Sequence, residues 1–195
     1  TVQNFTSVRN SSSQIVMGCD GMPLMQFGAI NTGRYKAGAT PQTTHIFSWP
    51  MNNYWVTNFN ADQRGGHTWD YYITSTSDTS NVFATRFGWG ARIPFLTRVI
   101  PGAGTGENMP EGSFITGWPE NILLVSATPY NDGERVVIHI REIEGKTASL
   151  KLKNGLTGAD LELTEVDPTG GRIKGDPGIV GPLESRFFSI QLKKK

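Results

Sequence analysis

Apolar and polar residues alternate along much of the second half of the chain. Three stretches each place three apolar side chains on one face of an extended strand: Val136, Ile138 and Ile140; Ala148, Leu150 and Leu152; and Phe188, Ile190 and Leu192. Because successive side chains of a strand point to opposite faces, this period of two predicts half-buried strands. Asn154-Gly155 predicts a tight turn after the second stretch. We therefore expect a small antiparallel β-sandwich of five or six short strands from about residue 121 to the end.

The first half also predicts strands, but it is more aromatic and less regular. Strand-like stretches occupy residues 1–8, 13–21, 23–30, 43–50 and 69–75, and residues 80–89 (SNVFATRFGW) predict a further strand. No segment of roughly 12 residues repeats apolar positions at intervals of three and four, so no helix is predicted. Residues 101–112 are rich in Gly and Pro and predict a loop.

These patterns predict an all-β chain in two parts. The irregular, aromatic part covers residues 1–118 and the regular sandwich covers residues 119–195, with the boundary near Pro119. The 23 Gly and 11 Pro residues suit a protein with many turns. The chain opens within a strand-like pattern, and we expect it to be part of a longer protein.

Composition narrows the classes of partner. The net charge is +1 and charged residues make up 18% of the chain, so neither nucleic acid nor a membrane surface is an expected partner. Cys19 is the single cysteine, which excludes an intramolecular disulfide, and it is expected to be a small buried side chain. The sequons at Asn4 and Asn10 favour a secreted or periplasmic protein over a cytoplasmic one.

The strongest candidate for a binding surface is residues 51–75 (MNNYWVTNFNADQRGGHTWDYYITS), where asparagines and large rings are dense. Sugars bind proteins by stacking on flat rings and by hydrogen bonding to amides and carboxylates. The candidate side chains are Asn52, Asn53, Trp55, Asn58, Asp62, His67, Trp69 and Asp70. In the alternative interpretation the rings form core, and the asparagines satisfy buried backbone groups.

No other motif predicts catalysis or metal binding within this chain. The three histidines, His45, His67 and His139, are far apart, and a zinc site near His67 would need the loop to bring Asp62 and Asp70 to it. Carboxylate pairs are typical of glycosidases, but the candidates Asp62, Asp70, Asp78, Glu107 and Glu111 lie in or beside turn-like segments. We therefore expect no catalytic residue, no metal ligand and no cofactor in this chain.

The block IFSWPMNNYWVTNF, followed by GGHTWDYYI, resembles the β-region that follows the catalytic domain in glycoside hydrolase family 38, the α-mannosidases. The opening TVQNFTSV and CDGMPLMQFGAI resemble the strand pair that precedes this block in the family. The tail ILLVSATPYNDGERVVIHIREIEGKTASLKL is similar to the C-terminal sandwich. The resemblance covers nearly the whole chain, and Asn-Asn-Tyr-Trp-x-Thr-Asn-Phe is its most specific part.

The resemblance implies a fold and a partner. It implies that residues 1–118 are part of a mutarotase-like β-supersandwich, followed by a smaller β-sandwich. It also implies retaining hydrolysis of α-mannosides by a zinc ion and an Asp nucleophile. These belong to an N-terminal catalytic domain that has no counterpart here. The expected partner is that domain of the same longer chain, whose cleft the candidate side chains would help to wall, and the chain alone is expected to be inactive.

Two other classes of function stay open. A free-standing carbohydrate-binding module would expose a coplanar pair among the five tryptophans, Trp49, Trp55, Trp69, Trp89 and Trp118. A structural or interaction domain without a ligand would bury the aromatic block and expose an apolar patch that matches a partner.

Overall fold

The computed structural model describes residues 2–31, 37, 38, 40–51, 62–93, 95–97, 99, 112–130, 133–176 and 178–192. The chain divides into two compact units, Thr1–Thr97 and Arg98–Lys195. Antiparallel sheets dominate both units, which confirms the predicted all-β class. The division falls before the predicted boundary near Pro119, because β6 (Ile115–Thr116) pairs with β10 (Lys153–Asn154) in the second unit.

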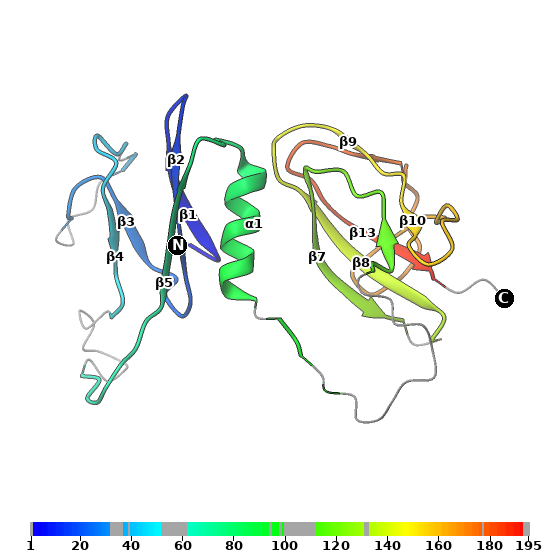
Figure 1. Cartoon of the computed structure of the whole chain (residues 1–195), viewed down its shortest axis with the longest axis horizontal. Coiled ribbons are helices and arrows are strands. Elements are labelled where there is room, and N and C mark those ends of the chain that lie inside the picture. Colours follow the sequence, from blue (N-terminus) through cyan, green and yellow to red (C-terminus); the bar gives the residue numbers. More distant parts are fainter. Residues whose placement is uncertain are drawn as a thin grey trace. The chain divides into compact units, whose positions relative to one another are not determined.

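The first unit is built around a three-stranded antiparallel sheet with the order β1-β2-β5. Its strands are β1 (Phe5–Arg9), β2 (Gln14–Cys19) and β5 (Tyr71–Thr76), which agree with three of the predicted stretches. A separate pair, β3 (Met25–Phe27) and β4 (Ile46–Ser48), lies on one side of this sheet, and a helix lies on the other (Figure 1).

That helix, α1 (Asn81–Arg92), occupies the segment for which a strand was predicted, so the prediction of a strand at residues 80–89 was wrong. Ser80 caps the helix, because its side-chain oxygen accepts a hydrogen bond from the Phe83 N–H at 3.1 Å. The buried residues of α1, Ala84, Thr85 and Gly88, are small. The segment therefore lacks large apolar residues at intervals of three and four, the pattern that predicts a helix.

Small residues allow α1 to approach the sheet closely. A Cβ atom added to Gly88 would lie 2.4 Å from the Cβ of Phe5, and one added to Gly18 would lie 3.2 Å from the Cβ of Ala91. The alternate β2 residues Gln14, Val16 and Gly18 are buried on this side. The Gln14 amide also donates to the Ser80 carbonyl at 3.0 Å, which ties the sheet to the start of the helix.

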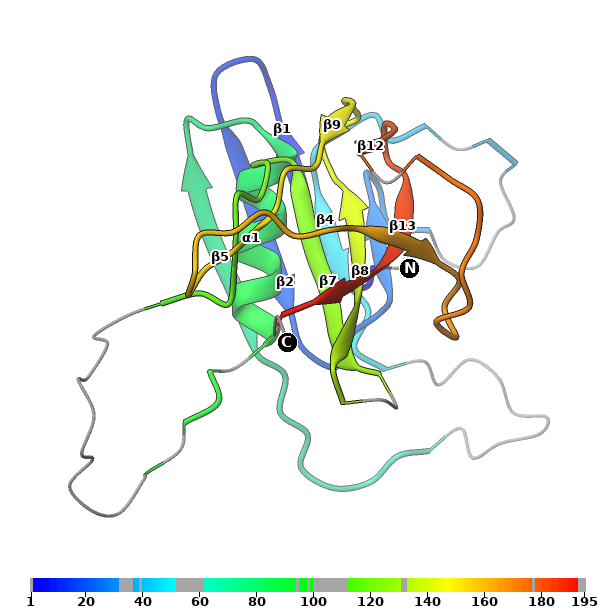
Figure 2. The ribbon, with the colours of Figure 1, turned by 90° about the vertical axis from the view of Figure 1, so that its right-hand side faces the viewer.

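The second unit is a set of antiparallel sheets around one apolar core (Figure 2). The four-stranded sheet has the order β11-β13-β8-β7, formed by β7 (Ile122–Pro129), β8 (Arg135–Glu142), β11 (Thr164–Val166) and β13 (Ser185–Gln191). Two short pairs complete the described strands: β6 with β10, and β9 (Ala148–Ser149) with β12 (Ile179–Val180).

The predicted apolar stripes form this core. Its buried members are Ile115, Ile122, Ile138, Ile140, Ala148, Leu150, Leu152, Val180, Phe188 and Ile190. Val136 and Leu192, the remaining members of the predicted stripes, are partly buried and pack against it. The period of two therefore identified the inward faces of β8 and β13 correctly.

A buried carboxylate, Glu142, organises one end of this sandwich. It is fully buried and accepts hydrogen bonds from the backbone N–H groups of Glu144, Gly145 and Leu183, each at 2.8 Å. The Asn121 amide donates a further bond at 2.9 Å. Burial raises the pKa of this carboxyl, but these hydrogen bonds outweigh burial and lower the pKa to about 2.

A second buried polar contact joins β11 to β13. The side chains of Arg186 and Glu165 are both almost fully buried, and Arg186 Nε donates to Glu165 Oε1 at 2.8 Å. Arg186 Nη2 donates to the other carboxylate oxygen, so the pair is bidentate. The geometry matches a planar guanidinium to a carboxylate and leaves neither charge unpaired.

Substitution of Gly88 by Ala should destabilise the first unit, whereas Gly90→Ala should stabilise it. Alanine favours a helix over glycine by up to about 1 kcal/mol, and a Cβ at Gly90 would meet nothing within 4 Å. At Gly88 the added methyl group would overlap Phe5, so a net loss of about 1–3 kcal/mol is expected. Denaturant unfolding of the two variants measures both effects, and a stabilised Gly88→Ala variant would contradict this helix packing.

Substitution of Glu142 by Gln should destabilise the second unit by about 2–3 kcal/mol near pH 7, because backbone donors lose their carboxylate acceptor. The folded-state pKa lies below the ordinary value of 4.5, so ionised Glu142 contributes its full stability above that value. This contribution is lost as the pH falls from about 4.5 towards about 2.

Chemical denaturation at several pH values measures this dependence, and Glu120→Gln, which alters an exposed carboxylate of the same unit, is the matched control. The difference between wild type and Glu142→Gln should shrink with acid, while Glu120→Gln should follow wild type. A difference in unfolding free energy between wild type and Glu142→Gln that stays constant down to pH values near 2 would contradict this role of the ionised Glu142 carboxylate.

Candidate functional site

The predicted aromatic surface is described only in its second part. Four of the eight candidates, Asn52, Asn53, Trp55 and Asn58, lie outside the described residues. The other four, Asp62, His67, Trp69 and Asp70, lie on the segment that leads into β5. Their positions decide what this half of the surface can do.

His67 and Trp69 form a stacked pair of rings. Their centroids are 5.6 Å apart and their planes differ by 23°. The imidazole is exposed and the indole is half-buried, so the pair presents a flat surface to solvent. A platform of this kind suits the face of a sugar ring.

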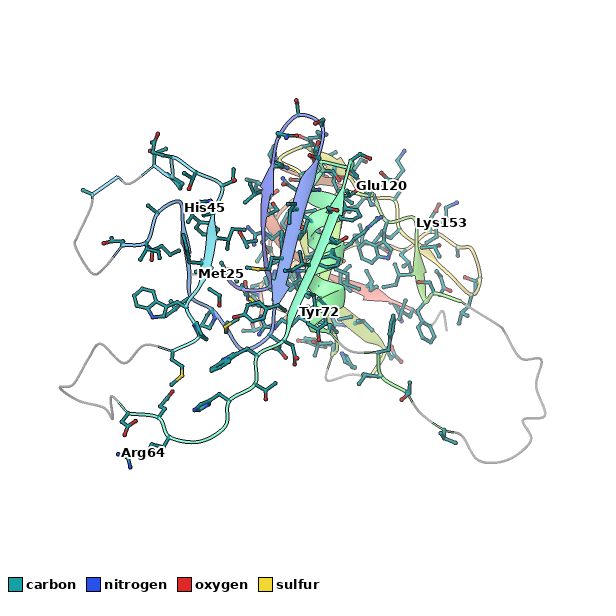
Figure 3. The ribbon with its side chains drawn as sticks, turned by 60° about the vertical axis from the view of Figure 1, so that its left-hand side comes forward. Met25, His45, Arg64, Tyr72, Glu120 and Lys153 are labelled. Carbon is teal, nitrogen blue, oxygen red and sulfur yellow. The ribbon has the colours of Figure 1, made fainter. Side chains whose placement is uncertain are left out.

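Asp62 does not join this pair. It accepts a hydrogen bond from Arg64 Nε at 2.7 Å, and both side chains are exposed. Figure 3 shows Arg64 at the end of a loop that extends away from the sheet. An exposed ion pair of this type contributes little stability, so Asp62 belongs to a solvated turn.

Asp70 has a structural role through its backbone. Its carbonyl accepts a hydrogen bond from the Asp20 N–H at 3.3 Å, which continues the pairing of β5 with β2. Its side chain is exposed. Among the four candidates that the structure describes, His67 and Trp69 are brought into contact and the other two are not.

A partly buried cluster beside β5 was not predicted. The Tyr71 hydroxyl lies 2.7 Å from Ser48 Oγ, and both hydroxyls lie 3.1 Å from the Met22 sulfur. Cys19 Sγ donates to the Met22 carbonyl at 3.3 Å. Cys19 is buried, as the sequence predicts, but no spacing in the sequence links Met22 to Ser48 and Tyr71. The cluster fixes β4 against the beginning of β5.

The remaining titratable candidates have structural surroundings. No group of three or more His, Cys, Asp or Glu side chains lies close enough to hold a metal ion in the part of the chain that is described. Asp78 accepts from the Ser80 N–H at 2.9 Å, and hydrogen bonding to Ser80 lowers the pKa of its carboxyl. Glu107 and Glu111 lie outside the described residues.

His139 lies on β8 and is half-buried. Its ring stacks on Phe187 with a centroid separation of 4.2 Å, and Nε2 lies 2.6 Å from Ser185 Oγ. Burial, with a smaller effect from Arg141, lowers the pKa of the imidazole. These contacts make His139 a packing residue of the second unit.

The tryptophans that the structure describes differ in their surroundings. Trp49 is 42% exposed, whereas Trp118 packs against the core and donates from Nε1 to the Ile115 carbonyl at 3.1 Å. Trp69 stacks on His67 rather than on another indole. Trp55 lies outside the described residues.

On the face of the β1-β2-β5 sheet opposite α1, contacts such as that of Ser48 with Tyr71 cover only part of the surface, and several apolar side chains stay exposed. Ile15 is 52% exposed and Ile73 is 66% exposed. In the sheet register, Ile15 lies beside Val8 and Ile73 lies beside Met17. Tyr71 continues this stripe and is 43% exposed. An apolar stripe across three strands is the usual mark of a surface that packs against another.

No protein-family model matches the chain, and no curated protein matches it in sequence. Within the described residues, no helix has the length and apolar character needed to cross a bilayer.

Proposed function

We propose that this chain is a non-catalytic β-sandwich region of a glycoside hydrolase similar to family 38, an α-mannosidase-like enzyme. In this role the first unit packs on the N-terminal catalytic domain of the same longer chain. The segment that contains His67 and Trp69 helps to wall the cleft of that domain. The resemblance of the block around residues 46–73 supports the family, and the all-β architecture is compatible with it.

The exposed apolar stripe of Ile15 and Ile73, on the face of the β1-β2-β5 sheet opposite α1, is the observation that carries the proposal. A sheet gains stability by burying its apolar side chains, at roughly 25 cal/mol per Å². On the side under α1 Gln14 and Val16 are buried, whereas Ile15 and Ile73 on the other side remain more than half exposed. A partner domain that covers this stripe would bury these side chains. In a free-standing module they would stay exposed to solvent.

In this proposal the hydrolysis takes place in the partner domain. The zinc ion and the Asp nucleophile that the resemblance implies belong there. The described residues of this chain offer no side-chain group that fits a metal ion. His67 and Trp69 offer a flat platform and a ring nitrogen, which suit contact with a bound sugar rather than bond cleavage.

A second candidate is a free-standing carbohydrate-binding module, and the exposed stack of His67 on Trp69 favours it. In that case the platform would bind sugar without any partner domain. The two candidates differ in what the isolated chain does with mannosides, so one set of assays separates them.

The purified chain should not hydrolyse p-nitrophenyl α-mannoside, with or without added zinc. The expected rate equals that of buffer containing zinc, because loss of both nucleophile and metal costs many orders of magnitude in rate. Turnover that depends on zinc and disappears with a chelator would contradict the proposed function.

Tryptophan fluorescence during titration with methyl α-mannoside tests the second candidate. A saturable change that is lost in Trp69→Ala, but kept in the matched variant Trp118→Phe, would favour the binding module. An unchanged spectrum from a folded chain, verified by circular dichroism, supports the scaffold role.

A further inference from the structure

β5 is the last strand of its sheet, and the directions of its backbone groups can be deduced. The Asp20 N–H donates to the Asp70 carbonyl, so this antiparallel pair is hydrogen-bonded. Hydrogen-bonded pairs alternate along an antiparallel ladder. Tyr72, Thr74 and Thr76 therefore direct their N–H and C=O groups towards β2.

The other three residues of β5 direct their backbone groups away from the sheet. These residues are Tyr71, Ile73 and Ser75. The hairpin between β1 and β2 gives the same assignment, because Asn10 N–H donates to the Ser13 carbonyl and sets the odd residues of β2 towards β1. Within the described residues, no backbone partner lies on this outer edge of β5.

The outer edge of β5 lacks the features that usually protect an edge strand. Its sequence, YYITST, contains no charge, no proline and no bulge. By contrast, β7 is the edge of the other large sheet and carries a bulge between Leu124 and Ser126 and a proline at Pro129. β1, the opposite edge of the first sheet, ends in the charged Arg9.

The chemistry of this edge specifies its occupant. Three N–H and three C=O groups alternate at intervals of two residues, a spacing that an extended backbone matches. A strand added there would place alternate side chains beside Tyr71 and Ile73, so it would prolong the exposed apolar stripe. The fitting occupant is thus an extended segment with apolar residues at every second position and without proline.

We propose that β5 accepts such a strand from another polypeptide segment, which extends the β1-β2-β5 sheet by β-strand addition. The inference rests on the proposed function only for the source of the strand, which would be the remainder of the longer chain. The proposed mode of docking depends only on the backbone geometry of Tyr71, Ile73 and Ser75.

The test uses the chain with a fluorescent peptide of about eight residues that alternates Val and Thr between terminal lysines. Fluorescence anisotropy should show saturable binding to wild type. Ser75→Pro should weaken binding at least about tenfold, because proline removes an outward N–H and blocks the edge without removing a bond to β2. Ser75→Ala is the matched control and should bind like wild type.

A peptide with proline at its centre should not bind. If Ser75→Pro fails to fold, Ile73→Lys places a charge on the same edge and should weaken binding in its stead. No saturable binding by wild type, or equal binding by wild type and the folded edge variant, would overturn the proposal. Sedimentation velocity that shows a dimer dissolved by the edge variant would also overturn it, since the occupant would then be a second copy.

These outcomes are separable from the proposed function. Zinc-dependent hydrolysis by the isolated chain would overturn the family role and leave the edge of β5 untouched. Failure of the peptide to bind would overturn strand addition and leave the exposed stripe of Ile15 and Ile73 as the proposed docking surface.

Discussion

A sheet with two apolar faces needs two covers, and this constraint governs the first unit. The helix α1 supplies one cover, and the contact is close because Phe5 lies where a side chain on Gly88 would be. On the same side Gln14 and Val16 are buried. On the other side Ile15 and Ile73 remain more than half exposed. The proposal of a docking role follows from this asymmetry between the two faces.

The second unit buries the apolar faces of its strands against one another. Its apolar stripes from β8 and β13 close on Ala148, Leu150 and Leu152 in a single core. Its buried charges are also satisfied, since Glu142 receives several backbone hydrogen bonds and Arg186 pairs with Glu165. The second unit thus buries its apolar stripes in one core, whereas the first unit leaves Ile15 and Ile73 exposed.

The sequence predicted most strands because alternation is a direct consequence of strand geometry. It missed α1 because Phe83, Phe87 and Trp89 favour strands, while the residues that face the sheet are small. The decisive signal is Ser80, the residue that caps the start of the helix. The site was harder to predict. The stack of His67 on Trp69 follows from local spacing, but the contact among Met22, Ser48 and Tyr71 depends on tertiary packing that no local pattern records.

Hydrogen exchange along β5 tests the central claim most directly, because it reports whether the sheet ends there in the isolated chain. The account predicts alternation: the amides of Thr74 and Thr76 should be protected by β2, and those of Ile73 and Ser75 should exchange rapidly. Protection of all four amides to the same degree would contradict the account, since the outer edge would then already be paired and the sheet would have no place for a further strand.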